Sequence, residues 1–181
     1  TVLVASNDPA VAGLVWAADQ GIPTSAVDHK DFGRDRAAFE ENLLKRVLAA
    51  QPDILCLAGF MRILSPTFIV HFAGKMLNIH PSLLPKYPGL HTHARVLAAG
   101  DAEHGASVHR VESVLDGGRI LTQAKIAVLP DDTPEQLAER VLAIEYPLLI
   151  ATVRAIAEGR IRLNEGTGTR ILWLNHRLEL E

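Results

Sequence analysis

An amide, an imidazole and a carboxylate stand in segments of this sequence that are rich in proline and glycine. Asn78 and His80 open the run NIHPSLLPKYPG (78–89), and Asp116 lies in LDGG (115–118). Residues two apart in an extended segment leave the backbone on the same side, so the amide and the imidazole can reach one reacting atom. The two glycines after Asp116 permit a turn that brings its carboxylate back toward the imidazole. The trio therefore has the composition of an acyl-transfer site.

Acyl transfer to an amine would give each of these side chains a role. The oxyanion of the tetrahedral intermediate needs a hydrogen-bond donor, which Asn78 can be, and the leaving nitrogen needs a proton. His80, with an ordinary pKa of about 6.5, can stabilise the oxyanion as imidazolium and exchange protons near neutrality. Asp116 can orient the imidazole, raise its pKa and receive protons from the attacking ammonium. Taken singly, each residue has a structural alternative as a turn former or a satisfied polar core residue.

Histidines are concentrated in the middle of the chain, which raises the alternative of a zinc site because imidazole is a common metal ligand. No HExxH pattern and no cysteine pair accompany them, so we predict no metal. Five of the eight histidines fall in this stretch: His80, His91, His93, His104 and His109.

The composition, with 48% hydrophobic and 22% charged residues in 181, is typical of one globular domain. No apolar run approaches the roughly 18 residues of a membrane span, and the net charge of −3 provides no basic field for nucleic acid. Cys56 is the only cysteine, which excludes an internal disulfide and favours a reducing, cytoplasmic location. Its setting in ILCLA (54–58) predicts a buried strand.

Strand and helix patterns alternate along the chain, which predicts an α/β fold with a parallel sheet. Residues 107–112 and 120–128 alternate as a pair of antiparallel strands joined by the LDGG loop. A long helix should begin at Pro134, be kinked or interrupted at Pro147 and end near Gly159. The other predicted strands are 2–6, 23–27, 54–58 and 76–79, and the other predicted helices are 9–20, 35–50, 66–72 and 92–99.

The run NIHPSLLPKYPGLHTH (78–93), together with AGFMRIL (58–64), SVH (107–109) and LDGG, resembles the phosphoribosylglycinamide formyltransferase family over residues 1–162. The resemblance implies a Rossmann-like formyltransferase fold, a mostly parallel twisted sheet flanked by helices with an antiparallel edge hairpin. It also implies 10-formyltetrahydrofolate as formyl donor and the glycinamide amine of 5'-phosphoribosylglycinamide as acceptor in de novo purine synthesis. No metal is needed for that reaction.

The resemblance also assigns residue roles. Asn78, His80 and Asp116 become the catalytic trio, and the bond between Leu84 and Pro85 is expected to be cis. Arg62 would meet the carboxylate tail of the folate, Arg36 the phosphate of the ribonucleotide, and Glu145 its ribose hydroxyls, beside Asn78. Three residues, His93, Ser107 and His109, would support the acid/base centre through hydrogen bonds. The implied folate-binding residues are Leu57, Met61, Arg62, Ile63, Leu64, Phe68, Val111, Leu115 and Asp116. For each group outside the trio, ordinary packing or a solvated surface position remains the alternative.

The sequence departs from the family pattern in two places. Arg119 follows LDGG where the family often carries proline, which would loosen or recharge the folate loop. The chain also opens directly on a strand, so we expect a single formyltransferase domain over residues 1–181 that lacks the first strand, phosphate loop and helix. Residues 164–181 are expected to form a C-terminal tail.

Other functions stay open at this point. Formyltetrahydrofolate deformylase uses water in place of the amine with a similar trio, but it usually adds an N-terminal regulatory domain and has a different loop after NIH. Methionyl-tRNA formyltransferase would add a longer basic C-terminal domain. A catalytically inactive folate-binding homologue is the third alternative. We expect small-molecule substrates, and the sequence leaves a homodimer open.

Overall fold

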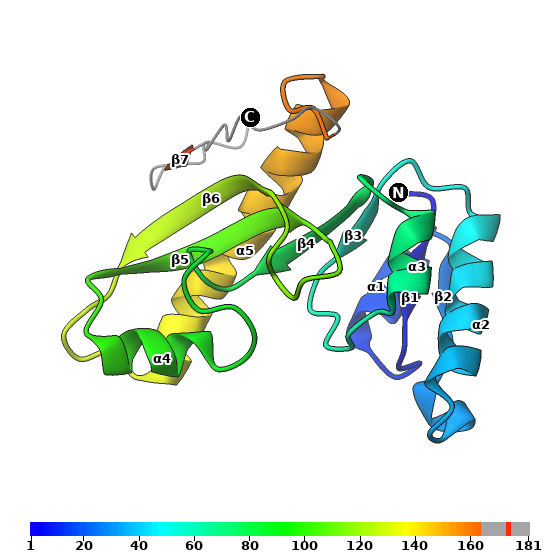
Figure 1. Ribbon diagram of the computed structural model, residues 1–181, viewed down its shortest axis with the longest axis horizontal. Coiled ribbons are helices and arrows are strands. Elements are labelled where there is room, and N and C mark those ends of the chain that lie inside the picture. Colours follow the sequence, from blue (N-terminus) through cyan, green and yellow to red (C-terminus); the bar gives the residue numbers. More distant parts are fainter. Residues whose placement is uncertain (164–172, 175–181) are drawn as a thin grey trace. The chain divides into compact units, whose positions relative to one another are not determined.

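The computed structural model describes residues 1–163 and 173–174 (Figure 1). The chain divides into two compact units. The first unit comprises Thr1–Leu55 and Phe60–Phe72, and the second comprises Cys56–Gly59 and the chain from Ala73 onward. Most of the predicted 164–181 tail therefore lies outside the described residues. No helix within the described ranges is long and apolar enough to cross a membrane.

The first unit has a small parallel sheet in which β1 (Val4–Ser6) pairs with β2 (Thr24–Ala26). Its helices are α1 (Ala12–Asp19), the 3₁₀ helix η1 (His29–Phe32), α2 (Arg36–Ala49) and α3 (Pro66–His71). The prediction that the first helix begins near Pro9 was wrong. The Asp8 carboxylate accepts a hydrogen bond from the Ala10 amide (2.9 Å), which forms a turn and delays the helix to Ala12.

Helix α2 contributes one apolar face to the core of the first unit. Phe39, Leu43 and Val47 recur at helical spacing and are buried. Asp35 caps the helix, because its carboxylate accepts a hydrogen bond from the Ala38 amide (2.9 Å). Helices α2 and α3 lie side by side (Figure 1).

The second unit is built on a sheet with the strand order β3-β4-β5-β6-β7. Antiparallel pairing joins β4 to β5 and β5 to β6, whereas β7 pairs parallel to β6. The strands are β3 (Leu55–Leu57), β4 (Met76–His80), β5 (Glu103–Arg110), β6 (Ile120–Ala127) and β7 (Trp173–Leu174). The predicted hairpin is confirmed, although β5 begins at Glu103 instead of 107. Gly105 concealed this start, since a glycine weakens the strand pattern.

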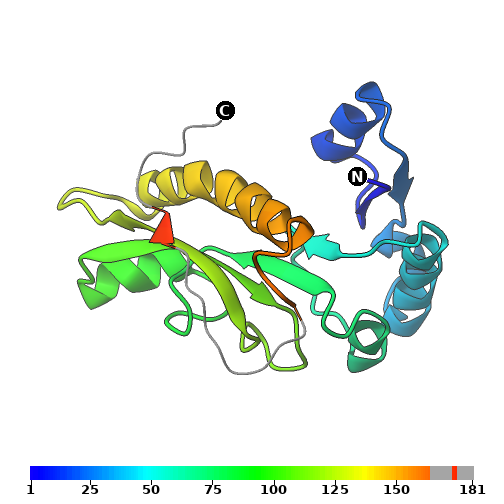
Figure 2. The ribbon, with the colours of Figure 1, turned by 90° about the horizontal axis from the view of Figure 1, so that it is seen from above.

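The long helix α5 (Pro134–Ala157) covers one face of this sheet, where it contacts β5 and β6 (Figure 2). Thr133 and Gln136 form a reciprocal capping box at its start. Leu137, Val141 and Leu148 are fully buried. The predicted interruption at Pro147 does not occur, because the buried turns on both sides hold the helix together across the missing hydrogen bond, and a kink at this residue stays a prediction. The shorter helix α4 (Thr92–Ala99) has its predicted bounds.

Cys56 is exposed, so the prediction that it is a core residue was wrong. It lies in β3, one of the two outer strands in the order of the five-stranded sheet. An outer strand is covered on fewer sides than a central one, and an apolar run by itself cannot distinguish the two positions.

Candidate active site

Strand β4 presents the predicted amide and imidazole side by side. Asn78 lies opposite His109 of β5, and His80, the last residue of β4, lies opposite Ser107. Since alternate residues of a strand share a face, these side chains gather on one side of the sheet. His80, Ser107 and His109 are buried. The hydrogen-bonded pairing of β4 with β5 therefore fixes the position of the imidazole.

Both ring nitrogens of His80 face hydrogen-bond acceptors. Nε2 lies 2.9 Å from the Tyr87 carbonyl oxygen, and Nδ1 lies 3.3 Å from Oδ2 of Asp116. Burial is the largest influence on this histidine and lowers its pKa, while the Tyr87 carbonyl and the Asp116 carboxylate act in the opposite direction. The ring can therefore gain a proton during a reaction and find both of its N–H groups accepted.

Asp116 is held on the other side of His80. Its backbone adopts a left-handed conformation with φ of 50°, and its Oδ2 accepts a hydrogen bond from the Gly89 amide (2.8 Å). Burial raises the pKa of this carboxyl, but hydrogen bonds from His109 and Gly89 and the charge of protonated His80 outweigh it, so the pKa is lowered. The side chain is therefore ionised near neutral pH, beside the imidazole.

His109 links the amide to the carboxylate. Its Nδ1 lies 2.8 Å from the Arg110 carbonyl oxygen and thus carries a proton. Its Nε2 lies 3.2 Å from Nδ2 of Asn78 and 3.5 Å from Oδ1 of Asp116. Nε2 therefore lies between the Asn78 amide and the Asp116 carboxylate, so His109 positions both side chains, and an N–H of Asn78 can donate to another oxygen.

The chain between β4 and α4 is tied to the sheet by buried polar side chains. Ser107 Oγ accepts from the Leu84 amide (3.0 Å) and donates to the Ser82 carbonyl (2.6 Å). Gln123 of β6, which the sequence did not single out, donates to both the Leu84 carbonyl and Ser107 Oγ, each at 2.8 Å. The predicted cis bond between Leu84 and Pro85 is confirmed.

His93 makes its hydrogen bond to a second histidine. Its Nδ1 lies 3.0 Å from Nε2 of His104, which is 1% exposed. Burial, together with the charges of His93 and His80, lowers the pKa of His104 to about 4. The described residues contain no group of three side chains placed to hold a metal ion.

The first unit contains Arg36 and part of the predicted folate-binding set. Arg36 forms an ion pair with Glu40 at 2.7 Å and donates a hydrogen bond to the Ile63 carbonyl. Glu40 also accepts from the Ser65 amide, and these hydrogen bonds overcome the effect of burial, so the pKa of Glu40 is lowered. Arg36, Glu40, Ser65 and Phe68 line a cavity of about 620 Å³. Arg36, predicted for the phosphate, thus lies with residues predicted for the folate.

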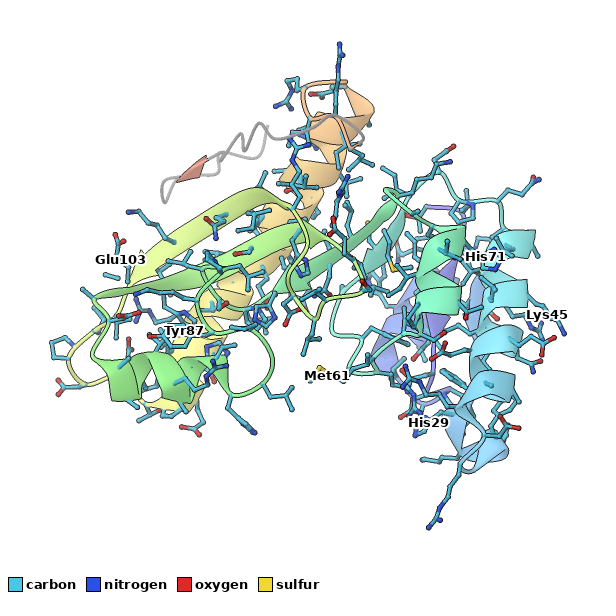
Figure 3. The ribbon with its side chains drawn as sticks, in the orientation of Figure 1. His29, Lys45, Met61, His71, Tyr87 and Glu103 are labelled. Carbon is cyan, nitrogen blue, oxygen red and sulfur yellow. The ribbon has the colours of Figure 1, made fainter. Side chains whose placement is uncertain are left out.

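The predicted folate-binding residues differ in exposure. In the first unit Met61 (Figure 3) and Ile63 are 75% and 65% exposed, whereas Leu64 and Phe68 belong to the core. Arg62 lies over the ring of Phe39, 5.0 Å from its centre. In the second unit Leu115 is exposed, and Leu57 and Val111 are half-buried.

Glu145, predicted to bind ribose hydroxyls, lies on α5 and is half-buried. Burial raises the pKa of its carboxyl. The part of the chain that the structure describes gives this carboxylate no hydrogen bond and no ion pair, so its oxygens can accept from a ligand.

Known proteins of similar sequence are named for formyl transfer or for purine biosynthesis. The formyl transferase family model matches residues 1–153. Phosphoribosylglycinamide formyltransferase of Escherichia coli is 43% identical over 172 residues, which span 95% of this chain and 79% of that protein. The trifunctional purine biosynthetic protein adenosine-3 of Bos taurus is 44% identical over 96% of this chain, which spans only 17% of that much longer protein.

Solved structures agree. Phosphoribosylglycinamide formyltransferase of Coxiella burnetii has a TM-score of 0.81 and 45% identity, over 88% of this chain and 74% of its own. Glycinamide ribonucleotide transformylase 1 of Symbiobacterium toebii has a TM-score of 0.84 and 36% identity, over 90% and 79%. The α/β fold is thereby confirmed, and the chain belongs to the formyl transferase family and, within it, to the phosphoribosylglycinamide formyltransferases.

Proposed function

We propose that this chain transfers the formyl group of 10-formyltetrahydrofolate to the glycinamide amine of 5'-phosphoribosylglycinamide. The observation that carries the proposal is the environment of His80, whose two ring nitrogens face the Tyr87 carbonyl (2.9 Å) and the Asp116 carboxylate (3.3 Å). An imidazole held between two acceptors is suited to stabilise charge and to exchange a proton. The family membership supports the same reaction.

In this proposal the amine attacks the formyl carbon directly. The new carbon–nitrogen bond forms while the carbonyl oxygen becomes an oxyanion, which accepts a hydrogen bond from an N–H of Asn78 and is stabilised by the positive charge of protonated His80. The carbon–N10 bond of the folate then breaks, and N10 takes up one proton in place of the one that the amine releases. Asp116 orients His80 and receives the amine proton, directly or through water. The products are tetrahydrofolate and the formylated amine.

The two substrates need different contacts. We infer that in the first unit the exposed Met61 and Ile63 contact the flat rings and the linker of the folate, and that Arg62 meets its carboxylate tail. Glu145 has unoccupied acceptor oxygens for ribose hydroxyls. For Arg36 the contact with the Ile63 carbonyl and the cavity shared with Phe68 favour an anionic end of the folate over the ribonucleotide phosphate.

The proposal is tested by mixing the chain with 10-formyltetrahydrofolate, with and without phosphoribosylglycinamide, and following tetrahydrofolate and formate. We expect tetrahydrofolate to form only when the ribonucleotide is present, and the rate to fall at least about 100-fold in His80→Ala. His71→Ala, which removes an exposed imidazole from α3, is the matched control and should retain the wild-type rate.

Release of formate without the ribonucleotide would contradict the transferase and indicate the deformylase. Binding of the folate by a folded chain that forms no product in either mixture would indicate the inactive folate-binding homologue.

A further inference from the structure

We propose that Gln123 is a positioning residue for formyl transfer: from β6 it anchors the 82–90 segment, whose backbone groups hold His80 and Asp116. This inference rests on the proposed function. Gln123 is 4% exposed, so its hydrogen bonds are shielded from water. Its side chain touches neither His80 nor Asp116 by any hydrogen bond among the described residues, and it would act on them through the segment.

Gln123 and Ser107 form one buried network beneath the segment. The Gln123 amide donates to the Leu84 carbonyl and to Ser107 Oγ, both at 2.8 Å. Ser107 Oγ accepts from the Leu84 amide and donates to the Ser82 carbonyl. With these four bonds the serine oxygen and the glutamine amide nitrogen satisfy three backbone groups at residues 82 and 84. Breaking one link would leave buried polar groups unpaired.

The same segment supplies a backbone partner to each of two catalytic candidates. Three residues after Leu84, the Tyr87 carbonyl lies 2.9 Å from Nε2 of His80. Two residues further, the Gly89 amide donates to Asp116 at 2.8 Å. A shift of the segment would therefore move both contacts together.

The side-chain anchors between the segment and α4 or Asp101 are closer to water. Asp101 accepts from Lys86 Nζ (2.8 Å) and from the Tyr87 hydroxyl (2.9 Å), and Arg95 donates to the Pro88 carbonyl. Lys86 and Arg95 are exposed side chains, and exposed polar contacts hold a backbone less firmly than buried ones. Tyr87 lies near α4 in Figure 3, with the Arg95 guanidinium 5.2 Å from its ring centre. Apart from Asp116 itself, the shielded contacts that reach the segment from the neighbouring strands thus come from Gln123 and Ser107, while the buried Ser82 hydroxyl donates within the segment to the Lys86 carbonyl (2.7 Å).

The test is Gln123→Met, which keeps the length and most of the volume of the side chain and removes the donor. If the segment drifts, the Tyr87 carbonyl no longer favours the charged form of His80, so the pKa of His80 falls. The other groups that act on this ring, Asp116, His109 and Arg95, are chemically unchanged in the variant. We expect NMR titration of the His80 ring to shift to lower pH, and kcat to fall about 10- to 100-fold with KM nearly constant.

Thr122→Val is the matched control. Thr122 is the neighbouring residue on β6, is 2% exposed, and shares a buried hydrogen bond with Thr152 of α5 on the opposite face. The Thr122→Val variant should lower the melting temperature as Gln123→Met does. It should leave kcat and the pH of the His80 titration at wild-type values. If Gln123→Met folds poorly, Ser107→Ala is measured in its place, because it breaks the same network from β5. It should lower kcat and shift the His80 titration in the same direction.

A His80 titration in folded Gln123→Met or Ser107→Ala that coincides with the wild-type curve would overturn the proposal. So would an equal change in Thr122→Val, because the effect would then be one of general stability. The titration requires no turnover. It therefore tests the anchoring of the segment by Gln123 independently of whether the wild-type chain transfers formyl groups.

Discussion

Replacing Asp116 with asparagine removes the charge beside His80 while retaining its shape. An asparagine oxygen can still accept the hydrogen bond from the Gly89 amide, which Asp116 accepts at 2.8 Å. The turn should therefore persist, and the variant isolates the electrostatic part of the arrangement. Both partners are almost completely buried, with side chains 7% and 8% exposed for His80 and Asp116, so water screens their interaction weakly.

The size of the effect follows from the geometry. A unit positive charge on His80 and the carboxylate at 3.3 Å attract by about 5 kcal/mol at an effective dielectric constant of about 20. This is an upper limit, because the remaining solvent and the neighbouring dipoles compensate part of the loss. If Asp116→Asn removes about half to most of this attraction from the transition state, the rate should fall about 10²- to 10⁴-fold.

The assay is a profile of kcat/KM against pH for wild type and Asp116→Asn. The Asp116 carboxylate raises the pKa of His80. Its removal should therefore shift the part of the kcat/KM profile that follows protonation of His80 to lower pH. Glu112→Gln is the control: it neutralises an acid of the same loop, one that forms an ion pair with Arg110. Its kcat/KM should stay within about twofold of the wild-type value. If folded Asp116→Asn kept kcat/KM within threefold of wild type at every pH, the electrostatic role assigned here to Asp116 would be refuted.

Three further variants test the frame of the site. Gly118→Ala places a Cβ 2.0 Å from a carbonyl oxygen of β5 and should distort the LDGG turn and lower kcat about tenfold or more, whereas Gly13→Ala, with nothing within 4 Å, should keep kcat in the same assay. Because the pKa of His104 is about 4 in the folded state and about 6.5 in the unfolded state, the folded state binds fewer protons between about pH 4 and pH 6.5. Urea unfolding should show stability rising with pH across that window by about 3 kcal/mol, and less in His104→Gln. Leu137→Ala, at a fully buried position, should cost about 2–5 kcal/mol in the same unfolding assay, against less than about 1 kcal/mol for the exposed Leu142→Ala.

Elements with clear periodicity or strong boundary residues were predicted well from the sequence. The helix at 92–99 has its predicted bounds, and α5 begins at Pro134 as expected. The return of Asp116 toward His80 was also predictable, since alternate residues of a strand share a face and two glycines permit a turn.

The errors have physical causes that a single chain does not display. Local side-chain hydrogen bonding delayed the first helix beyond Asp8, and Gly105 concealed the start of β5. Cys56 lies in an apolar run that predicts burial, but the position of its strand in the sheet depends on pairing with distant residues. The burial of Gln123 was not predicted, because a polar residue between Thr122 and Ala124 in a strand fits a solvent-facing position as well as a buried one.

The NIHPSLLPKYPG motif is long because the site uses backbone groups at its far end. His80 and Asp116 are held by a carbonyl at Tyr87 and an amide at Gly89, atoms that every residue possesses and that no residue type signals. What the residue types determine is the path of the chain that presents them. Tyr87 and Gly89 have φ values of 57° and 77°, so the segment turns sharply through left-handed conformations that glycine adopts without strain. Substitutions between His80 and Gly89 should therefore change the titration of His80 even where the altered side chain lies outside the site.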